Sequence, residues 1–439
     1  MKKVVKFGGS SLVSAEQFRK VRDIVLAEES RRYVVPSAPG KRFNGDAKVT
    51  DLLYQCYYAA ANGEDFSGLM KQIRDRYEEI IDGLELKLSL EDEFAQIAEN
   101  FRNRMGSDYA ASRGEYLNGL VLSAYLDYPF VDAAEVIRFD EKGEFDADTS
   151  NRLLGERLAD MPNAVIPGFY GSYEDGRIKT FSRGGSDITG SIVSSAVVAD
   201  LYENWTDVSG CLMADPRLIK DPAVIDVITY KELRELAYMG ATVLHEDAIF
   251  PVRKAGIPIN IRNTNRPGDK GTMIVASTCH RPDYTITGIA GKKGFVAVNI
   301  EKDMMNSEIG FCRRVLSEFE KQGISIEHMP SGIDTMTVIV HRDEFEAHEQ
   351  QVLAGIQRAV NPDYLDVEGD IALIAVVGRA MKSTRGTAGR IFSALAHANV
   401  NVKMIDQGSS EWNVIAGVRD EDFEKAIRAI YDIFINTQL

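Results

Sequence analysis

The sequence predicts an α/β protein: a mainly parallel sheet flanked by helices, followed by two small ferredoxin-like β-α-β-β-α-β modules. Two observations lead to this prediction. Over the first two-thirds of the 439 residues, short apolar runs alternate with helical patterns, as they do in parallel sheets with crossover helices. Further along, the chain repeats itself, because residues 314–329 align without gaps on residues 390–405.

The elements of the large sheet follow in order. Residues 14–29 form an amphipathic pattern that Ser14 is expected to cap, and residues 63–111 are charged and helical, which indicates an inserted helical region. A polar hairpin follows the third strand. The expected strands are the apolar runs 2–7, 32–40 and 163–172.

The repeat defines the C-terminal part. RVLSEFEKQGISIEHM (314–329) and RIFSALAHANVNVKMI (390–405) share their apolar positions, and each is preceded by a strand and followed by a strand and a helix. Two copies are too few for a solenoid and indicate a paired regulatory or binding unit. We expect three domains: residues 1–280, 285–367 and 368–439.

Composition excludes several classes of protein. The chain is 44% hydrophobic and 27% charged, without a long apolar run, so we expect a cytoplasmic protein without a membrane span or signal peptide. The net charge of −15 argues against a nucleic-acid partner, since a phosphate backbone requires a cationic surface.

Cysteine and histidine give no metal-binding pattern. The four cysteines lack a C-x-x-C pair, so we expect free, buried thiols. His245 stands beside Glu246 and Asp247, and we interpret it as structural. The cysteines are Cys56, Cys211, Cys279 and Cys312.

A lysine and two glycines follow the first strand, in KFGGSSL (6–12). Gly8 and Gly9 expose backbone N–H groups beside Lys6, which predicts an anion-binding loop. The spacing matches neither the P-loop nor the dinucleotide-binding motif. The alternative is a simple turn after a strand.

A second glycine cluster opens a helix of small and apolar residues, in SRGGSDITG. A helix N-terminus carries free N–H groups and partial positive charge, so it attracts anions, and Arg183 before it can bind a carboxylate with two hydrogen bonds. The alternative is that Ser186 or Asp187 only caps the helix.

KFGGSSL, SRGGSD and WTDVSGCLMADPR, in this order and followed by two small modules, resemble the aspartate kinases. The resemblance covers the whole chain and implies the amino-acid-kinase fold with two C-terminal ACT domains. It implies the monofunctional type, with ATP and Mg²⁺ as phosphoryl donor and no tightly bound cofactor.

The resemblance also implies roles for individual residues. Glu115 would hold the substrate ammonium, unless it is only an acid in a first helical turn, and Asp207 would contact ATP, unless it only forms a turn. The catalytic residues would be Lys6, Gly9, Ser186 and Asp187. Aspartate would bind to Ser37, Thr50, Glu115 and Arg183, and ATP to Lys6, Gly8, Gly9, Ser10, Thr206, Asp207 and Arg217.

The chain departs from the family pattern at Leu212 and Thr242, which puts nucleotide contacts there in doubt. The loop at residues 39–49 carries Lys41, Arg42 and Lys48. We slightly favour a mobile lid over a merely solvated loop, because Gly40 and Gly45 can serve as hinges.

ACT domains bind small amino acids, so the resemblance implies an effector, lysine first and threonine second, and a homodimer or homotetramer formed through these domains. Glu327 would bind the effector ammonium, or it forms only a surface ion pair. The expected effector residues are Met304 or Met305, Gly310, Ser325, Ile326, Glu327 and Ser331.

The resemblance therefore implies ATP-dependent phosphorylation of the aspartate β-carboxylate under amino-acid feedback, the first step toward lysine, threonine and methionine. A carboxylate needs no base to become a nucleophile, so positioning and charge neutralisation suffice. The alternatives are a kinase for glutamate or N-acetylglutamate, and a catalytically silent amino-acid sensor.

Overall fold

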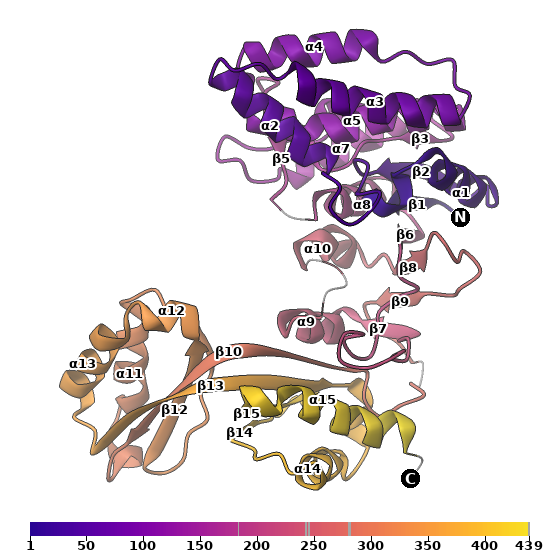
Figure 1. The fold of residues 1–439 in the computed structure, drawn as a ribbon. Helices are drawn as coiled ribbons and strands as arrows, with labels where there is room; N and C mark the ends of the chain where they lie inside the picture. Colours follow the sequence, from indigo (N-terminus) through magenta and orange to yellow (C-terminus); the bar gives the residue numbers. More distant parts are fainter. Residues whose placement is uncertain (183, 242–243, 245, 280–281, 438–439) are drawn as a thin grey trace. The chain divides into compact units, whose positions relative to one another are not determined.

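A computed structural model describes the chain except for residues 183, 242–243, 245, 280–281 and 438–439. The chain forms two compact units (Figure 1). Two segments inside the expected 1–280 domain, 212–223 and 231–241, group with the second unit; the domain boundaries given above stay a prediction. The first unit is Met1–Cys211, Val224–Tyr230 and Thr242–Cys279, and the second is Leu212–Ala223, Lys231–Ala241 and His280–Leu439.

The first unit contains a seven-stranded sheet with the order β3-β2-β1-β6-β8-β9-β7. Among these strands only β8 and β9 pair antiparallel, so the predicted mainly parallel sheet is confirmed. The strands are β1 (Lys3–Phe7), β2 (Arg31–Pro36), β3 (Ala164–Val165), β6 (Leu201–Thr206), β7 (Val227–Thr229), β8 (Ile259–Asn263) and β9 (Thr272–Val275).

Strand β1 is central and all five of its residues are buried. Val5 and Phe7 enter a core formed with the first five helices. Lys6 alternates with them and points to the opposite face, where helix α8 (Gly185–Ala196) packs. The five helices are α1 (Ala15–Leu26), α2 (Val49–Ala61), α3 (Ser67–Gly83), α4 (Glu91–Arg102) and α5 (Ser107–Leu126).

The helical region is longer than the predicted 63–111, since it begins at Val49 and ends at Leu126. Helix α5 is buried on most sides, so its sequence lacks the polar face by which an amphipathic helix is recognised. Ser14 does cap α1, accepting from the N–H of Gln17. The remaining helices near this sheet are α6 (Ala133–Val136), α7 (Ala147–Leu158) and α10 (Glu246–Ala255).

The prediction of one strand over 163–172 is wrong. Two short strands form, β3 in the main sheet and β4 (Tyr170–Ser172), which pairs with β5 (Ile178–Thr180) in the predicted hairpin. Pro167 lacks the N–H that a continuous ladder needs, and Phe169 has a φ of 79°, which ends the extended backbone.

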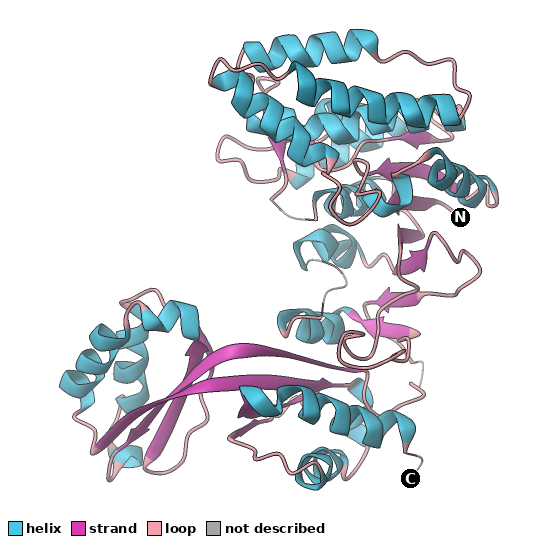
Figure 2. Ribbon diagram, in the orientation of Figure 1, coloured by secondary structure: helices cyan, strands magenta, loops and turns pink. Residues whose placement is uncertain are grey.

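The second unit contains a six-stranded antiparallel sheet with the order β11-β12-β10-β13-β15-β14. Its two central strands, β10 and β13, are 14 residues long each and pair antiparallel with each other (Figure 2). The N-terminal half of β10 lies beside the second module and the C-terminal half in the first, so the two modules share strands. The strands are β10 (Gly288–Glu301), β11 (Ile326–His328), β12 (Thr335–His341), β13 (Tyr364–Val377), β14 (Met404–Asp406) and β15 (Asn413–Arg419).

Helices complete the predicted β-α-β-β-α-β pattern in the first module. In the second, the described residues after β13 form only one α-β-β-α run, and the N-terminal half of β10 supplies the remaining strand beside β13. In the first module, Val315 and Phe319 of the first helix pack against β10 and β12 side chains in a common core. The helices are α11 (Phe311–Glu320), α12 (Arg342–Glu346), α13 (Glu349–Val360), α14 (Thr387–His397) and α15 (Phe423–Tyr431); α9 (Tyr230–Tyr238) precedes them in the chain.

Cys56 and Cys211 are buried, as predicted, and Cys312 is partly buried. Cys279 is exposed, so the prediction of buried thiols is wrong for this residue, which follows the last strand of the first sheet. In the described part of the chain, no helix combines the length and apolar character that a membrane crossing needs.

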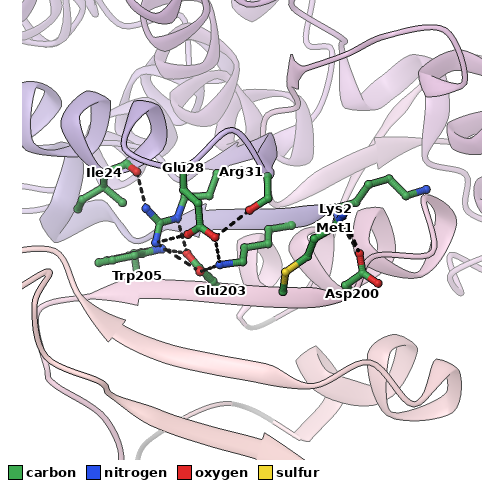
Figure 3. A network of polar contacts seen from close by, with 10 residues as sticks. Met1, Lys2, Ile24, Glu28, Arg31, Asp200, Glu203 and Trp205 are labelled. Atoms are coloured by element: carbon green, nitrogen blue, oxygen red, sulfur yellow. Dashed lines mark hydrogen bonds and ion pairs between the residues drawn. The ribbon is translucent and has the colours of Figure 1, made fainter.

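A buried ion network joins β1, β2 and β6 (Figure 3). Glu203 is 1% exposed and lies 3.1 Å from Lys3 Nζ and 2.9 Å from Arg31 Nε. Trp205 Nε1 donates to it at 2.9 Å, and Glu28 bridges both cations from the surface side. Every charge is paired, which is the condition under which charges are tolerated in a protein interior.

We expect Glu203→Gln to lower the free energy of unfolding of the first unit by about 3 kcal/mol, because two buried cations lose the carboxylate they share. Chemical denaturation followed by circular dichroism measures the change. The control is Asp200→Asn, which removes an exposed carboxylate 4.0 Å from the N-terminal ammonium and should cost less than about 1 kcal/mol. Equal losses for the two variants would contradict the expected role of the network.

Candidate active site

The ends of β1 and α8 bring together the two predicted catalytic charges. Lys6 Nζ lies 2.6 Å from Asp187 Oδ1, and the two side chains are 9% and 20% exposed. Asn204 on β6 donates from Nδ2 to the same oxygen at 2.8 Å. Sequence reasoning missed Asn204, although it pairs directly with Lys6 across parallel strands. Asp187 thus orients and neutralises Lys6.

The first glycine loop is a short 3-10 helix, Gly9–Leu12, which contains Ser10. Gly8 N donates to Trp205 O at 3.0 Å, so this N–H is engaged within the protein. A Cβ on Gly9 would lie 2.8 Å from Ala38 O and 3.1 Å from Gly40 N. Gly9 is therefore required for a close approach of two backbones, and the simple-turn alternative does not account for it.

Helix α8 begins with the second glycine cluster. Gly184 is its N-cap with a φ of 60°, and no side chain caps the helix, so the capping alternative for Ser186 and Asp187 is wrong. Ser186 is buried against Gly168. The helix has 12 residues, and its first N–H groups offer a site for an anion. Arg183 lies outside the described residues.

Phe169 is a residue that the sequence reasoning missed. Its φ of 79° is unusual for an aromatic residue, and it is held there because its N–H donates to Thr189 Oγ1 at 3.0 Å and its carbonyl accepts from Phe181 N at 3.0 Å. The ring lies where a side chain on Gly185 would be. Strained backbone of this kind clusters at functional sites, but it depends on tertiary contacts that no local pattern shows.

Glu115 is buried in the interior of α5, so the alternative that it is an acid in a first helical turn is wrong. Burial raises the pKa of this carboxyl to about 8, against the lowering effects of a backbone hydrogen bond from Ala38 and of the charges of Arg113 and Lys6. Its Oε2 atom has no hydrogen-bond partner. An unpartnered polar atom at this depth needs a ligand or a proton.

Ser37 and Thr50 lie at the two ends of the loop between β2 and α2. Ser37 N donates to Phe7 O at 3.1 Å, and its carbonyl accepts from Asn118 Nδ2 at 2.6 Å. Thr50 is in the first turn of α2. Asn118, one helical turn after Glu115, also keeps a buried unpartnered oxygen, and sequence reasoning missed it.

The predicted ATP residues are only partly brought together. Thr206 ends β6, and its hydroxyl donates to the Asp207 carboxylate at 3.1 Å. Arg217 belongs to the second unit, where its 81% exposed side chain pairs with Asp215 at 2.6 Å. Leu212 is in the same unit, and Thr242 lies outside the described residues. The role of Arg217 stays a prediction.

The predicted effector residues divide among several places in the second unit. Ser325 and Ile326 line a groove along α11, whereas Ser331 lines a pocket of about 280 Å³ on the helix-free face of the sheet. Gly310 is the N-cap of α11, and Met304 is exposed before it, next to the buried Met305.

Glu327 does not form the surface ion pair that was its alternative role. The side chain is 7% exposed and lies 3.9 Å from His341 Nε2. It also forms a hydrogen bond with the Tyr238 hydroxyl; burial and this carboxylate raise the pKa of Tyr238 to about 12. An ammonium would have to replace these partners to bind Glu327.

Comparison with known proteins agrees with this geometry. Residues 1–263 match the amino acid kinase family and residues 374–434 match an ACT domain. Aspartokinase 3 of Bacillus subtilis is 40% identical over 98% of both chains. The crystal structure of Clostridium acetobutylicum aspartate kinase, described as an allosteric enzyme, is 53% identical, covers 98% of this chain and all of its own, and superposes with a TM-score of 0.92.

Escherichia coli aspartokinase III is 25% identical, with 99% of both chains covered. Its structure with aspartate and ADP, called the R-state, gives a TM-score of 0.74, and its structure with lysine and aspartate, called the T-state, gives 0.72. The family match covers more than half of the chain, and the relatives span its full length. The chain therefore belongs to the amino acid kinase family and, within it, to the aspartate kinases.

Proposed function

We propose that this site transfers the γ-phosphoryl group of ATP to the β-carboxylate of L-aspartate, giving 4-phospho-L-aspartate and ADP. This is the first step toward the aspartate-derived amino acids lysine, threonine and methionine. One observation carries the assignment of the substrate site: the buried, unpartnered oxygen of Glu115, close enough to the Lys6–Asp187 pair that Lys6 lowers its pKa.

The substrate ammonium binds between Glu115 and Asp187. An ammonium has three donors and a positive charge, so it satisfies the free oxygen of Glu115 and favours the ionised carboxylate. Arg183 binds the α-carboxylate, and Ser37 and Thr50 line the pocket. This arrangement leaves the β-carboxylate free to face the phosphates.

Phosphoryl transfer then needs positioning more than acid–base chemistry. A β-carboxylate oxygen forms a bond to the γ-phosphorus while the bond to the ADP oxygen breaks, and charge spreads over the three remaining phosphoryl oxygens. Lys6, the backbone at Gly9 and Ser10, and the first turn of α8 with Ser186 stabilise that charge. Gly8 leaves room for the phosphates, and Thr206 and Asp207 contact the nucleotide; the contact expected from Arg217 rests on the sequence resemblance alone.

Magnesium fits the charge balance of the site. Asp187 at 2.6 Å offsets part of the Lys6 charge, so Lys6 alone does not balance the negative charge of the phosphates. When bound, Mg²⁺ carried by ATP supplies the missing positive charge, held chiefly by phosphate oxygens and water.

Lysine is the proposed feedback inhibitor, and the ACT modules join the subunits of a homodimer or homotetramer. The E. coli relative has been solved with lysine bound, which supports this choice of effector. Met304, Ile309 and Ile333 of the first module are 68%, 96% and 68% exposed. Exposed apolar side chains of this size are candidates for a contact surface.

The function is tested by trapping the acyl phosphate with hydroxylamine in the presence of ATP, Mg²⁺ and either aspartate or glutamate. Aspartate should give hydroxamate and glutamate should not. Lys6→Ala should lower kcat by about 100-fold or more, because a charge is lost at the transferred group. Lys20→Ala, on the exposed face of α1, is the control. A product from glutamate alone would overturn the proposal.

In the ligand-free protein, the free energy of unfolding of Glu115→Gln minus that of the wild type should be larger at pH 8 than at pH 4.5. The unfolded chain releases this proton near 4.5 and the folded protein near 8, so between these values the folded wild type binds more protons and its stability falls as pH rises. The change should amount to a few kcal/mol, measured by denaturation at several pH values. A stability difference that does not vary with pH would contradict the raised pKa of Glu115.

Lysine added to the same assay should raise the apparent KM for aspartate or ATP roughly 10-fold, which is a common size of allosteric coupling. Threonine at the same concentration should have a smaller effect. Inhibition by threonine without inhibition by lysine would contradict the proposal and identify threonine as the effector.

A further inference from the structure

The loop between β2 and α2, residues 37–48 (the β2–α2 loop), is joined at both of its ends to one arginine of α3. Arg76 donates from Nη2 to Gly40 O and from Nη1 to Ala47 O, the latter at 2.8 Å. The same Nη2 lies 3.3 Å from Asp46 Oδ2. One planar guanidinium therefore joins the beginning and the end of the loop, which only a forked donor can do.

Arg76 is not a surface residue that happens to touch the loop. Its side chain is 3% exposed, and that of Asp46 is 9% exposed. Asp46 is held in turn by Arg42, whose side chain and N–H lower the pKa of this carboxyl to about 2, with a smaller contribution from Arg76. Arg42 also reaches Glu79 on α3 at 3.2 Å. The base of the loop is anchored through Gly40, Asp46 and Ala47, whereas the tip at residues 41–45 is exposed, as is Lys48.

The segment that Arg76 holds is the one that supports the phosphate loop. Gly40 N donates to Gly9 O at 2.9 Å. A Cβ on Gly40 would lie 2.8 Å from the Gly9 carbonyl carbon and 3.0 Å from Ser10 N. Because the two backbones are in direct contact, a displacement of Gly40 changes the position of Gly9 and Ser10.

We propose that Arg76 is a positioning residue for phosphoryl transfer: by fixing Gly40 against Gly9, it holds the glycine loop in the geometry that receives the γ-phosphoryl group. Arg76 itself touches no substrate. The inference rests on the proposed function and adds to it a residue that lies outside the three sequence motifs.

The contacts of Arg76 also bear on the two interpretations of residues 39–49, a mobile lid or a merely solvated loop. A freely solvated loop would not place Gly40 O and Ala47 O on one buried guanidinium, and a lid hinged at Gly40 would have to break the contact of Gly40 with Gly9. The loop is a fixed support at its base, and only the exposed tip is free to respond to ligands.

The test compares three variants in the hydroxamate assay. Arg76→Ala should lower kcat roughly 100-fold, because a displacement of about 1 Å near the reacting atoms costs that much. Arg76→Lys keeps the charge but cannot join both carbonyls, so it should lose nearly as much. Arg74→Ala is the matched control: this arginine lies two residues earlier on α3, pairs with the surface residue Glu91 at 3.5 Å, and should stay within twofold of wild type.

Two readouts separate positioning from a loss of folding. In Arg76→Ala, hydrogen exchange should rise in residues 8–12 and 37–48 while the protection of β1 and β6 is kept. Guanidinium at a non-denaturing concentration should restore part of kcat, and the same concentration of sodium chloride should not, because only guanidinium replaces the lost hydrogen bonds.

Near-normal kcat in both Arg76→Ala and Arg76→Lys would overturn the proposal. So would a loss of kcat with a uniform rise in exchange across the first unit and no guanidinium rescue, since that combination describes destabilisation alone. Failure of the proposed function gives a different result, because the wild type itself would then form no hydroxamate from aspartate.

Discussion

The contact between the backbones of Gly9 and Gly40 is the constraint on which the first unit depends. β1 and β2 are parallel neighbours, so their loops leave the sheet at the same edge, and here the loops touch without side chains between them. The contact brings the end of β1, with Lys6, close to the loop that begins at Ser37. Helix α8 completes the same edge through Asp187. A larger residue at either glycine would separate these groups by more than the tolerance of an in-line transfer.

Strand β1 carries a buried lysine near each end. The polar groups around one lysine are all paired, whereas some of those around the other are not. Lys3 belongs to a closed network in which Glu203 is satisfied by two cations and the Trp205 indole. Lys6 acts on Glu115, which keeps a buried oxygen without a partner, as does Asn118 one turn later on α5. A fully satisfied network stabilises the fold. Polar atoms left unsatisfied at the same depth are a cost that a ligand can remove.

Much of this could be predicted from the sequence. The ends of parallel strands converge, so KFGGSSL and SRGGSD could be placed together, and the internal repeat predicted both ferredoxin-like modules. The residues that were missed act through tertiary contacts. The φ of Phe169 is imposed by Thr189 and Phe181. In the sequence, nothing distinguishes Arg76 from the other charged residues of its helix, because its partners lie in a distant loop. Asn204 could have been predicted, because the pairing of β1 with β6 places it beside Lys6.

In the proposed site, Glu115 connects the binding of the substrate ammonium to the order of the β2–α2 loop. Its carboxyl accepts a hydrogen bond from the N–H of Ala38, two residues before Gly40. Hydrogen bonds to an ionised acceptor are stronger than those to a neutral one. An ammonium that ionises Glu115 therefore tightens the loop at Ala38, while Arg76 fixes it at Gly40 and Ala47. In the site proposed here, binding of the amino acid and alignment of the glycine loop would favour each other.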